Sequence, residues 1–178
     1  MANSLNTYND SLNFPEDTKN FILDVDGVFT DGSFYYSEEG KLLKKFGDAD
    51  NDALSFLKDK LHIEMITGDK RGFPISKKRI GIDMGYPISL VSTFERVEWI
   101  KKRFKLEETI YMGDGIYDPL VFDKVGYAIA PQNAFFNTKK YSDHITESKG
   151  GGGAVAEAVI HILEHIFNEE FDVLKLKF

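Results

Sequence analysis

The chain has 178 residues, a formal net charge of −7 and 42% hydrophobic residues, which suits one domain with a substantial core. The acidic balance argues against nucleic acid or an anionic membrane surface as a partner. The chain has no cysteine and no apolar run of about 18 residues, which excludes disulfides, thiolate-bound zinc and a transmembrane helix, and we expect a cytoplasmic protein.

A polar stretch, residues 1–18, is expected to form a loose arm, and a buried strand follows it. The apolar residues 21–23 (FIL) end on Asp24 and Asp26, which are spaced i, i+2. Strand residues alternate faces, so these two carboxylates are predicted to point to the same side of the strand end. Gly27 then permits a sharp turn. Two close carboxylates repel each other, which favours a bound cation, and an Asp-rich turn without a ligand is the alternative.

Further along, predicted strands and helices alternate. A β-hairpin is expected over residues 33–46, with a four-residue loop at 37–40. The later elements are expected in this order: a helix capped by Asp50, strand 63–66, helix 75–79, a helix opened by a Ser92–Glu95 capping box, strand 109–112, helix 118–124, strand 127–130, strand 144–146 and helix 154–168. This alternation predicts an α/β fold, a three-layer α/β/α Rossmann-like parallel sheet. Residues 19–168 would form the domain and residues 169–178 a tail.

Three of the predicted strands end on polar residues that can support chemistry. The first ends on Asp24 and Asp26, the second on Thr67, and the third on the segment GDGIYD, which carries Asp114 and Asp118. The carboxyl ends of parallel strands lie along one edge of a sheet, where ligands bind. We therefore expect these five side chains around one crevice.

This set of residues suits phosphoryl transfer. Asp24 would attack phosphorus and form an aspartyl phosphate, and Asp26 would protonate the leaving alkoxide and later deprotonate water. Asp24 and Asp114 would hold Mg²⁺, a cation that prefers oxygen ligands. Thr67 and the Gly68 N–H group would donate hydrogen bonds to phosphoryl oxygens.

The DxD, strand-end Thr and GDxxxD motifs, in this order within residues 21–162, resemble the haloacid dehalogenase superfamily of phosphotransferases. The resemblance implies that the main-chain carbonyl of Asp26 is a further metal ligand. It also implies that Asp118 holds a metal-bound water or a neighbouring side chain, and that the backbone at Gly27 lies against the phosphoryl group.

The superfamily also places a lysine near the start of the helix before its third motif, and this chain has none there. Arg96 stands at a suitable helical position and is expected to be a catalytic cation. Lys77 or Lys78 would be the alternative source of that charge. Arg96 would then be an ordinary solvated helix residue.

The segments around the hairpin are too short to hold a cap domain. The hairpin and one helix fill the stretch between residues 32 and 66, and the stretch 68–91 is also too short for a folded cap domain. An uncapped site is open to water, so a neighbouring subunit would cover it. The apolar hairpin offers a surface for this pairing, and packing on its own domain is the alternative.

The phrases LDVDGVFTDG, KVGYAIAPQNA and GGGGAVAE, together with the short hairpin, resemble the 3-deoxy-D-manno-octulosonate 8-phosphate phosphatase family and the related domain fused to acylneuraminate cytidylyltransferases. The resemblance implies a capless, Mg²⁺-dependent homotetramer. It also implies a small phosphorylated sugar-acid substrate, a 2-keto-3-deoxy acid resembling octulosonate 8-phosphate or nonulosonate 9-phosphate.

Two features depart from that family. Gly152 and Ala156 stand where the family has arginines, in GGRGAVRE, and Gly115 replaces the second acid of its GDD. Arginine is the natural partner of a carboxylate or phosphate, so the resemblance does not imply that this chain has the same substrate as that family. A phosphatase for another small phosphometabolite and a non-catalytic oligomerisation or regulatory module are the alternatives.

Overall fold

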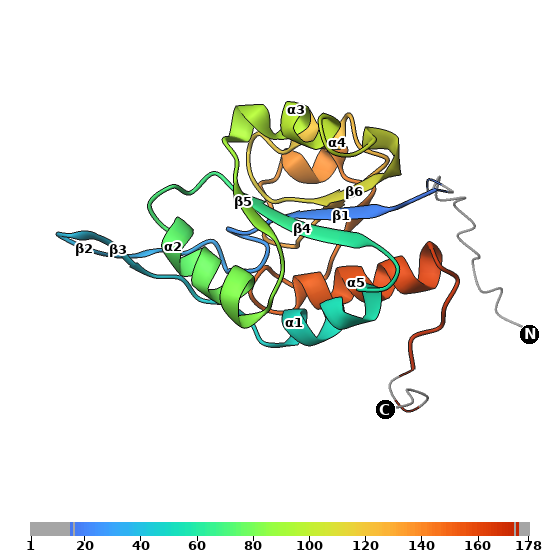
Figure 1. Ribbon diagram of the computed structural model, residues 1–178, viewed down its shortest axis with the longest axis horizontal. Helices are drawn as coiled ribbons and strands as arrows, with labels where there is room; N and C mark the ends of the chain where they lie inside the picture. Colours follow the sequence, from blue (N-terminus) through green and yellow to red (C-terminus); the bar gives the residue numbers. More distant parts are fainter. Residues whose placement is uncertain (1–14, 16, 173, 175–178) are drawn as a thin grey trace, which may run out of the picture.

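The computed structural model describes residues 15, 17–172 and 174, and it shows one parallel six-stranded sheet covered by helices on both faces (Figure 1). The strands lie in the order β5-β4-β1-β6-β7-β8. Their bounds are β1 (Asn20–Asp24), β4 (His62–Thr67), β5 (Ile88–Leu90), β6 (Thr109–Met112), β7 (Tyr127–Ala130) and β8 (His144–Ile145). The predicted three-layer α/β/α fold is confirmed, and the described residues form no cap domain. The division into arm, domain and tail stays a prediction, since residues 1–14, 16, 173 and 175–178 lie outside the described residues.

Two groups of helices enclose the sheet. The helices α3 (Arg96–Lys101) and α4 (Pro119–Phe122) lie over one face, and α1 (Ala49–Leu54), α2 (Phe73–Ser76) and α5 (Ala154–His165) lie over the other (Figure 1). Among the described residues, no helix combines the length and the apolar character needed to cross a bilayer.

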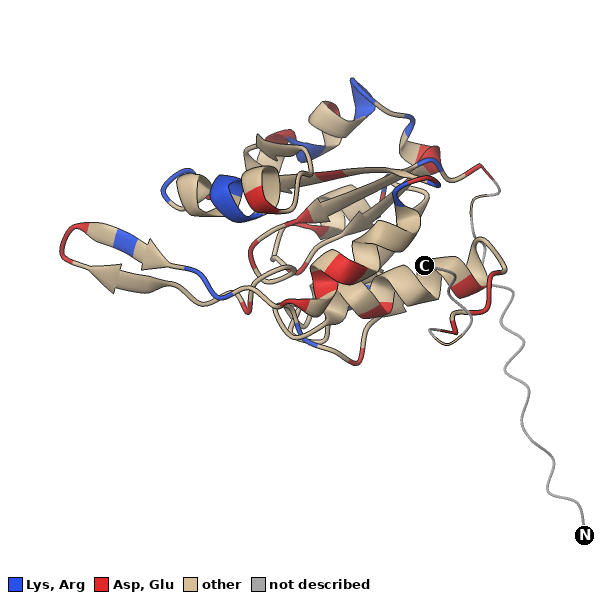
Figure 2. Cartoon of the chain, turned by 60° about the horizontal axis from the view of Figure 1, so that its bottom comes forward, with Lys and Arg blue, Asp and Glu red and all other residues tan. Residues whose placement is uncertain are grey.

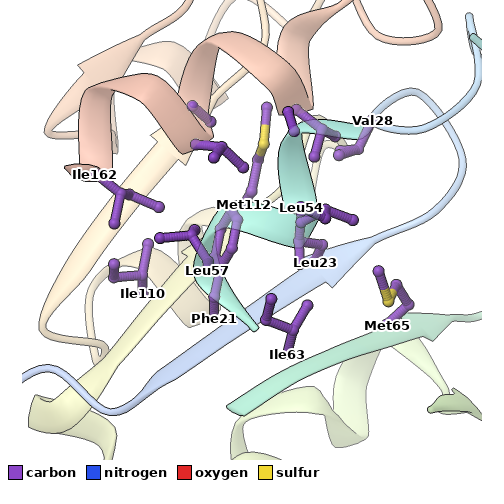
Figure 3. Packing of buried hydrophobic residues seen from close by; sticks show 14 of the residues in the cluster. Phe21, Leu23, Val28, Leu54, Leu57, Ile63, Met65, Ile110, Met112 and Ile162 are labelled. Carbon is purple, nitrogen blue, oxygen red and sulfur yellow. The ribbon is translucent and has the colours of Figure 1, made fainter. Parts of the chain in front are cut away.

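The central strands are buried on both faces, which explains their continuous apolar sequence. In β1, Phe21 and Leu23 join the larger apolar cluster beneath α1 and α5, where they meet Ile110 and Met112 of β6 (Figure 3). Ile22, between them, joins the second cluster on the α3 side. This alternation leaves the strand ends as the place where polar side chains reach solvent.

The first helix is capped differently from the prediction. The carboxylate of Asp48, rather than that of Asp50, accepts a hydrogen bond from the N–H of Ala49 at 2.8 Å. Asp50 is buried instead, and its Oδ1 accepts a hydrogen bond from the N–H of Ala156 at 3.1 Å. Asp50 therefore serves the beginning of α5, a helix distant in sequence.

Three further elements differ from the predicted ones. The Ser92 side chain makes no capping hydrogen bond, although its carbonyl accepts one from the N–H of Glu95 at 2.9 Å. The helix expected at 75–79 begins earlier, at α2, and continues as the π-helical segment Lys77–Asp83. The three-residue strand β5 was not predicted, because so short a segment has no distinct periodicity.

The predicted hairpin is confirmed and stands away from the body of the molecule (Figure 2). Its strands are β2 (Tyr35–Ser37) and β3 (Gly40–Leu43), and Ser37 pairs with Gly40, so the loop has two residues rather than four. Its large apolar side chains are exposed: Phe34, Tyr35, Tyr36, Leu42 and Leu43. Such a surface is typical of an interface, and the hairpin does not bury it against the described part of its own domain.

A histidine stack lies between the last strand and the last helix. The rings of His144 and His161 are 3.7 Å apart at their centroids and 7° from parallel, and the Tyr127 hydroxyl lies 2.9 Å from Nε2 of His161. Burial lowers the pKa of His161 to about 3, and the neighbouring His144 and His165 lower it as well. The folded protein therefore keeps this imidazole neutral in mild acid.

This stack predicts a loss of stability in mild acid. The unfolded chain takes up a proton on His161 as the pH falls through about 6.5, whereas the folded chain does so only near 3. Between pH 7.5 and 5.5 we expect the free energy of unfolding to fall by about 1 kcal/mol more in the wild type than in His161→Gln. Urea titrations at both pH values measure this difference, and equal losses in the two proteins would contradict it.

Candidate active site

The ends of two adjacent strands bring the acidic residues together, and a third strand end lies beside them. Asp24 is the last residue of β1, and Asp114 and Asp118 lie in the turn after the neighbouring strand β6. Carboxylate oxygens of these three residues lie within 4.8 Å of one another. Thr67 ends β4 on the other side of β1, so the three strand-end motifs share one edge of the sheet.

Glycine allows these strand ends to approach so closely. Gly27 has a φ of +83°, and a Cβ at this position would overlap the carboxylate of Asp114. A Cβ at Gly113 would likewise crowd the carboxylate of Asp118. Gly27 is therefore required by the close approach of the turns after β1 and β6, and Gly113 is required because Asp118 folds back against it within its own turn.

Arg96 supplies the positive charge beside the acidic group. Its side chain is only 5% exposed at the start of α3, and Nη1 donates to Asp24 Oδ2 at 2.7 Å and to Asp118 Oδ1 at 2.6 Å. The same nitrogen donates to the hydroxyl of Tyr111 at 2.7 Å, a strand residue that the sequence pattern marked only as apolar core. Lys78 instead pairs with Asp83 at 2.5 Å.

Lys77 is exposed. Of the three cations expected from the sequence, the structure thus brings only Arg96 into contact with the acidic group. It is not a solvated helix residue.

Burial raises the pKa of these carboxyl groups. It raises that of Asp24 to about 6, against the attraction of Arg96 and with repulsion from Asp118 added. Burial, together with repulsion from Asp24 and Asp118, raises the pKa of Asp114 to about 8. Burial alone would lower the pKa of Arg96, but Tyr111 and the carboxylates outweigh it and raise the pKa, so the guanidinium stays charged.

This acidic group has the composition of a site for a hard divalent cation. Asp24, Asp114 and Asp118 offer only carboxylate oxygens, and burial together with repulsion between them disfavours the charged forms of Asp24 and Asp114, whose pKa values are raised although Arg96 lies beside them. A divalent cation bound here would offset this cost. The carboxylate of Asp26 lies outside this group and contacts Thr67 and Lys44 instead, so the prediction that it points to the same side of the strand end as the Asp24 carboxylate is wrong.

Asp26 lies between Thr67 and a lysine that the sequence pattern did not identify. The Thr67 hydroxyl donates to Asp26 Oδ2 at 3.0 Å. The ammonium of Lys44 lies 2.6 Å from Asp26 Oδ1, and the Lys44 side chain is fully buried. Gly68, which was expected to bind phosphate, follows Thr67 directly and is exposed at this edge.

Asn133 links the turn that carries Gly27 to the glycine-rich segment 150–153. Its side-chain nitrogen donates to the carbonyl of Gly27 at 2.9 Å, and its side-chain oxygen accepts from the N–H of Gly150 at 2.6 Å. The N–H of Gly151 also donates to the carbonyl of Val28 at 3.1 Å. The glycine-rich segment therefore supports the turn that carries Gly27.

Aromatic side chains surround the turn that carries Asp114. Phe94 and Tyr117 are exposed, with their ring centroids 4.9 Å apart, and Phe135 and Phe136 form a second pair at 4.6 Å. The N–H of Phe135 donates to the carbonyl of Asp114 at 2.8 Å, which ties this pair to the site. A substrate at this edge would therefore meet aromatic as well as charged surface.

Comparison with known proteins gives consistent relatives. No protein-family model matches the chain. The 3-deoxy-D-manno-octulosonate 8-phosphate phosphatase of Haemophilus influenzae is 31% identical over 155 residues, which cover 84% of each protein. The enzyme of the same description from Escherichia coli K12 is 31% identical over 147 residues, 80% of this chain and 77% of its own length.

Solved structures agree with these relatives. The cobalt-bound form of the Haemophilus influenzae phosphatase superposes with a TM-score of 0.76 at 30% identity, over 85% of this chain and 91% of that one. The Moraxella catarrhalis 3-deoxy-D-manno-octulosonate 8-phosphate phosphatase was solved in complex with a magnesium ion, a phosphate ion and a KDO molecule. It superposes with a TM-score of 0.72 at 29% identity, over 86% of this chain and 90% of that one.

The acidic group predicts stabilisation by a divalent cation. A cation that binds only the folded state raises its stability, so we expect millimolar Mg²⁺ or Co²⁺ to raise the melting temperature above its value in EDTA. Asp114→Asn should abolish most of this rise, whereas Asp123→Asn, a change at an exposed residue paired with Lys124, should leave it intact. Differential scanning calorimetry measures it, and an unchanged rise in Asp114→Asn would contradict the assignment.

Proposed function

Since this chain belongs to the 3-deoxy-D-manno-octulosonate 8-phosphate phosphatase family of the haloacid dehalogenase superfamily and is a phosphatase, we propose that it hydrolyses a phosphorylated 2-keto-3-deoxy sugar acid. The proposed substrate resembles octulosonate 8-phosphate or nonulosonate 9-phosphate. The observation that carries the proposal is the buried Asp24, held by Arg96 at a strand end beside two further carboxylates. A non-catalytic module would have no need to keep these repelling charges, so family and site both favour the enzyme.

In the proposed first step, Asp24 attacks phosphorus as the bond to the leaving oxygen breaks, and Asp26 gives that oxygen a proton. The N–H of Val25 donates to Asp24 Oδ1 at 2.7 Å, which fixes the carboxylate plane. In the second step Asp26 takes a proton from water, and the water oxygen displaces Asp24 from the aspartyl phosphate. Asp24 is thereby regenerated.

The remaining site residues orient Asp24, Asp26 and the phosphoryl group. Asp118 holds the guanidinium of Arg96 and accepts from the N–H of Gly115 at 2.8 Å, so it positions rather than reacts. Thr67, with the backbone at Gly68 and Gly27, is proposed to donate hydrogen bonds to the phosphoryl oxygens.

We propose Mg²⁺ as the cofactor. It would be held by Asp24, Asp114 and the main-chain carbonyl of Asp26, with support from Asp118. When bound, it would offset the negative charge on the transferring phosphoryl group. The relatives support this choice, since the Moraxella catarrhalis enzyme was solved with magnesium.

A second substrate class is favoured by one observation. Gly152 and Ala156 replace the arginines typical of the family, whereas the aromatic pairs Phe94–Tyr117 and Phe135–Phe136 lie exposed at the site. Aromatic rings offer stacking surface for a nucleobase, so a nucleotide monophosphate is the alternative substrate.

A cytoplasmic location remains a prediction.

The activity itself is the first test. With Mg²⁺, we expect phosphate release from the sugar-acid phosphates to exceed release from sugar phosphates and nucleotides, and we expect none in EDTA. Asp24→Asn should lower kcat at least about a thousandfold, because it removes the nucleophile. Asp123→Asn is the control. Turnover that survives in Asp24→Asn would contradict the mechanism. A preference for nucleotides would contradict the sugar-acid substrate and favour the nucleotide monophosphate instead.

We also propose that the protein is a homotetramer assembled through its hairpins. The exposed apolar side chains of β2 and β3 support this, because burying them between subunits removes about 25 cal/mol of unfavourable hydration per Å². A neighbouring hairpin would also cover an active site that has no cap.

Light scattering after size-exclusion chromatography tests the assembly. We expect four times the mass of one chain for the wild type and a smaller assembly for Leu42→Lys/Leu43→Lys, which places charge on the hairpin. Ile82→Lys, at another exposed apolar residue, is the matched control and should keep the wild-type mass. A monomeric wild type, or an unaffected double variant, would contradict the proposal.

A further inference from the structure

A fully buried ammonium group lies on the side of Asp26 opposite to the acidic group. Lys44 directly follows β3, at the base of the hairpin, and its side chain has no exposed surface. Its Nζ lies 2.6 Å from Asp26 Oδ1 and 2.8 Å from Asp69 Oδ2, and it donates to Ser76 Oγ at 2.9 Å. Burying a lysine is costly unless it is paired, so these three oxygens fix where the ammonium lies.

Asp26 depends on this ammonium for its orientation. Its Oδ2 accepts a hydrogen bond from Thr67, whereas its buried Oδ1 receives no hydrogen bond of good geometry and meets Lys44 as an ion pair. Rotation of the carboxylate would separate this pair. Lys44 and Thr67 together therefore hold the carboxylate in one plane.

The surroundings of Lys44 are built to keep it there. A Cβ at Gly72 would overlap both Asp69 Oδ2 and the Cε atom of Lys44, so the cluster occupies space that only glycine leaves free. The N–H of Gly72 donates to Asp69 Oδ1 at 3.1 Å, and Lys41 pairs with Asp69 Oδ2 at 2.5 Å. Burial would raise the pKa of Asp69, but hydrogen bonds from Lys41 and Lys44 outweigh it and hold the pKa at about 2.

We propose that Lys44 is a positioning residue for catalysis: it holds the Asp26 carboxylate in place to protonate the leaving oxygen. This inference rests on the proposed function, in which Asp26 is the acid. It assigns to the hairpin a role inside its own active site, separate from any role in assembly.

Leaving groups that differ in their need for a proton provide the test. We would measure kcat/KM with Mg²⁺ for 4-nitrophenyl, phenyl and benzyl phosphate, whose leaving oxygens depend increasingly on an acid. Because general acid catalysis is worth about 10²–10⁴-fold, Lys44→Met should lose about a hundredfold on benzyl phosphate and only a few-fold on 4-nitrophenyl phosphate. Lys44→Arg should recover part of the loss. Lys45→Met, at the adjacent exposed lysine, should match the wild type on all three.

A second measurement separates positioning from a general loss of structure. In an Asp26→Asn background, Lys44→Met should add no further dependence on the leaving group, because the acid is already absent. Equal losses on all three substrates, or an added dependence in that background, would overturn the inference. If Lys44→Met does not fold, Lys44→Arg decides by the same series: a loss confined to benzyl phosphate supports the inference, and a uniform or absent loss overturns it.

Failure of the proposed function can be distinguished from failure of this inference. Wild-type protein without Mg²⁺-dependent turnover of 4-nitrophenyl phosphate, or Asp24→Asn with unchanged turnover, would overturn the function and the inference together. Turnover that needs Asp24 but shows no selective effect of Lys44→Met would overturn the inference alone.

Discussion

The ion pairs between Arg96 and the carboxylates of Asp24 and Asp118 are the constraint on which the site depends. Parallel strands bring three carboxylates to one edge of the sheet, where burial and mutual repulsion disfavour the charged forms of Asp24 and Asp114. A guanidinium that is itself buried offsets part of this charge from the first residue of α3. The length of β5 and the turn after it matter because they set where that helix begins.

A second buried cation repeats this arrangement on the other side of β1. Arg96 contacts Asp24, the proposed nucleophile, from a helix, and Lys44 contacts Asp26, the proposed acid, from the base of the hairpin. The two carboxylates of the strand end therefore have separate cationic partners.

The fold could be predicted because apolar runs mark buried strands and parallel strands share an edge. The same rule anticipated that Asp24, Thr67 and Asp114 would lie together. The contacts of Lys44 and Asn133 could not be predicted from the sequence, because they depend on how the hairpin base and a late loop return to the sheet. No local pattern encodes such contacts. Asp50 was assigned to the wrong helix for the same reason: its side chain binds the N–H of Ala156 in α5, 106 residues further along the chain.

The sheet ends in two very short strands, three residues in β5 and two in β8. A strand of another molecule that added to either edge would find few free backbone groups to bind, so growth of the sheet from one molecule to the next gains little. Stacking of such edges is also how cross-β fibrils begin. The molecule can thus expose an apolar hairpin while its main sheet resists fibrous aggregation.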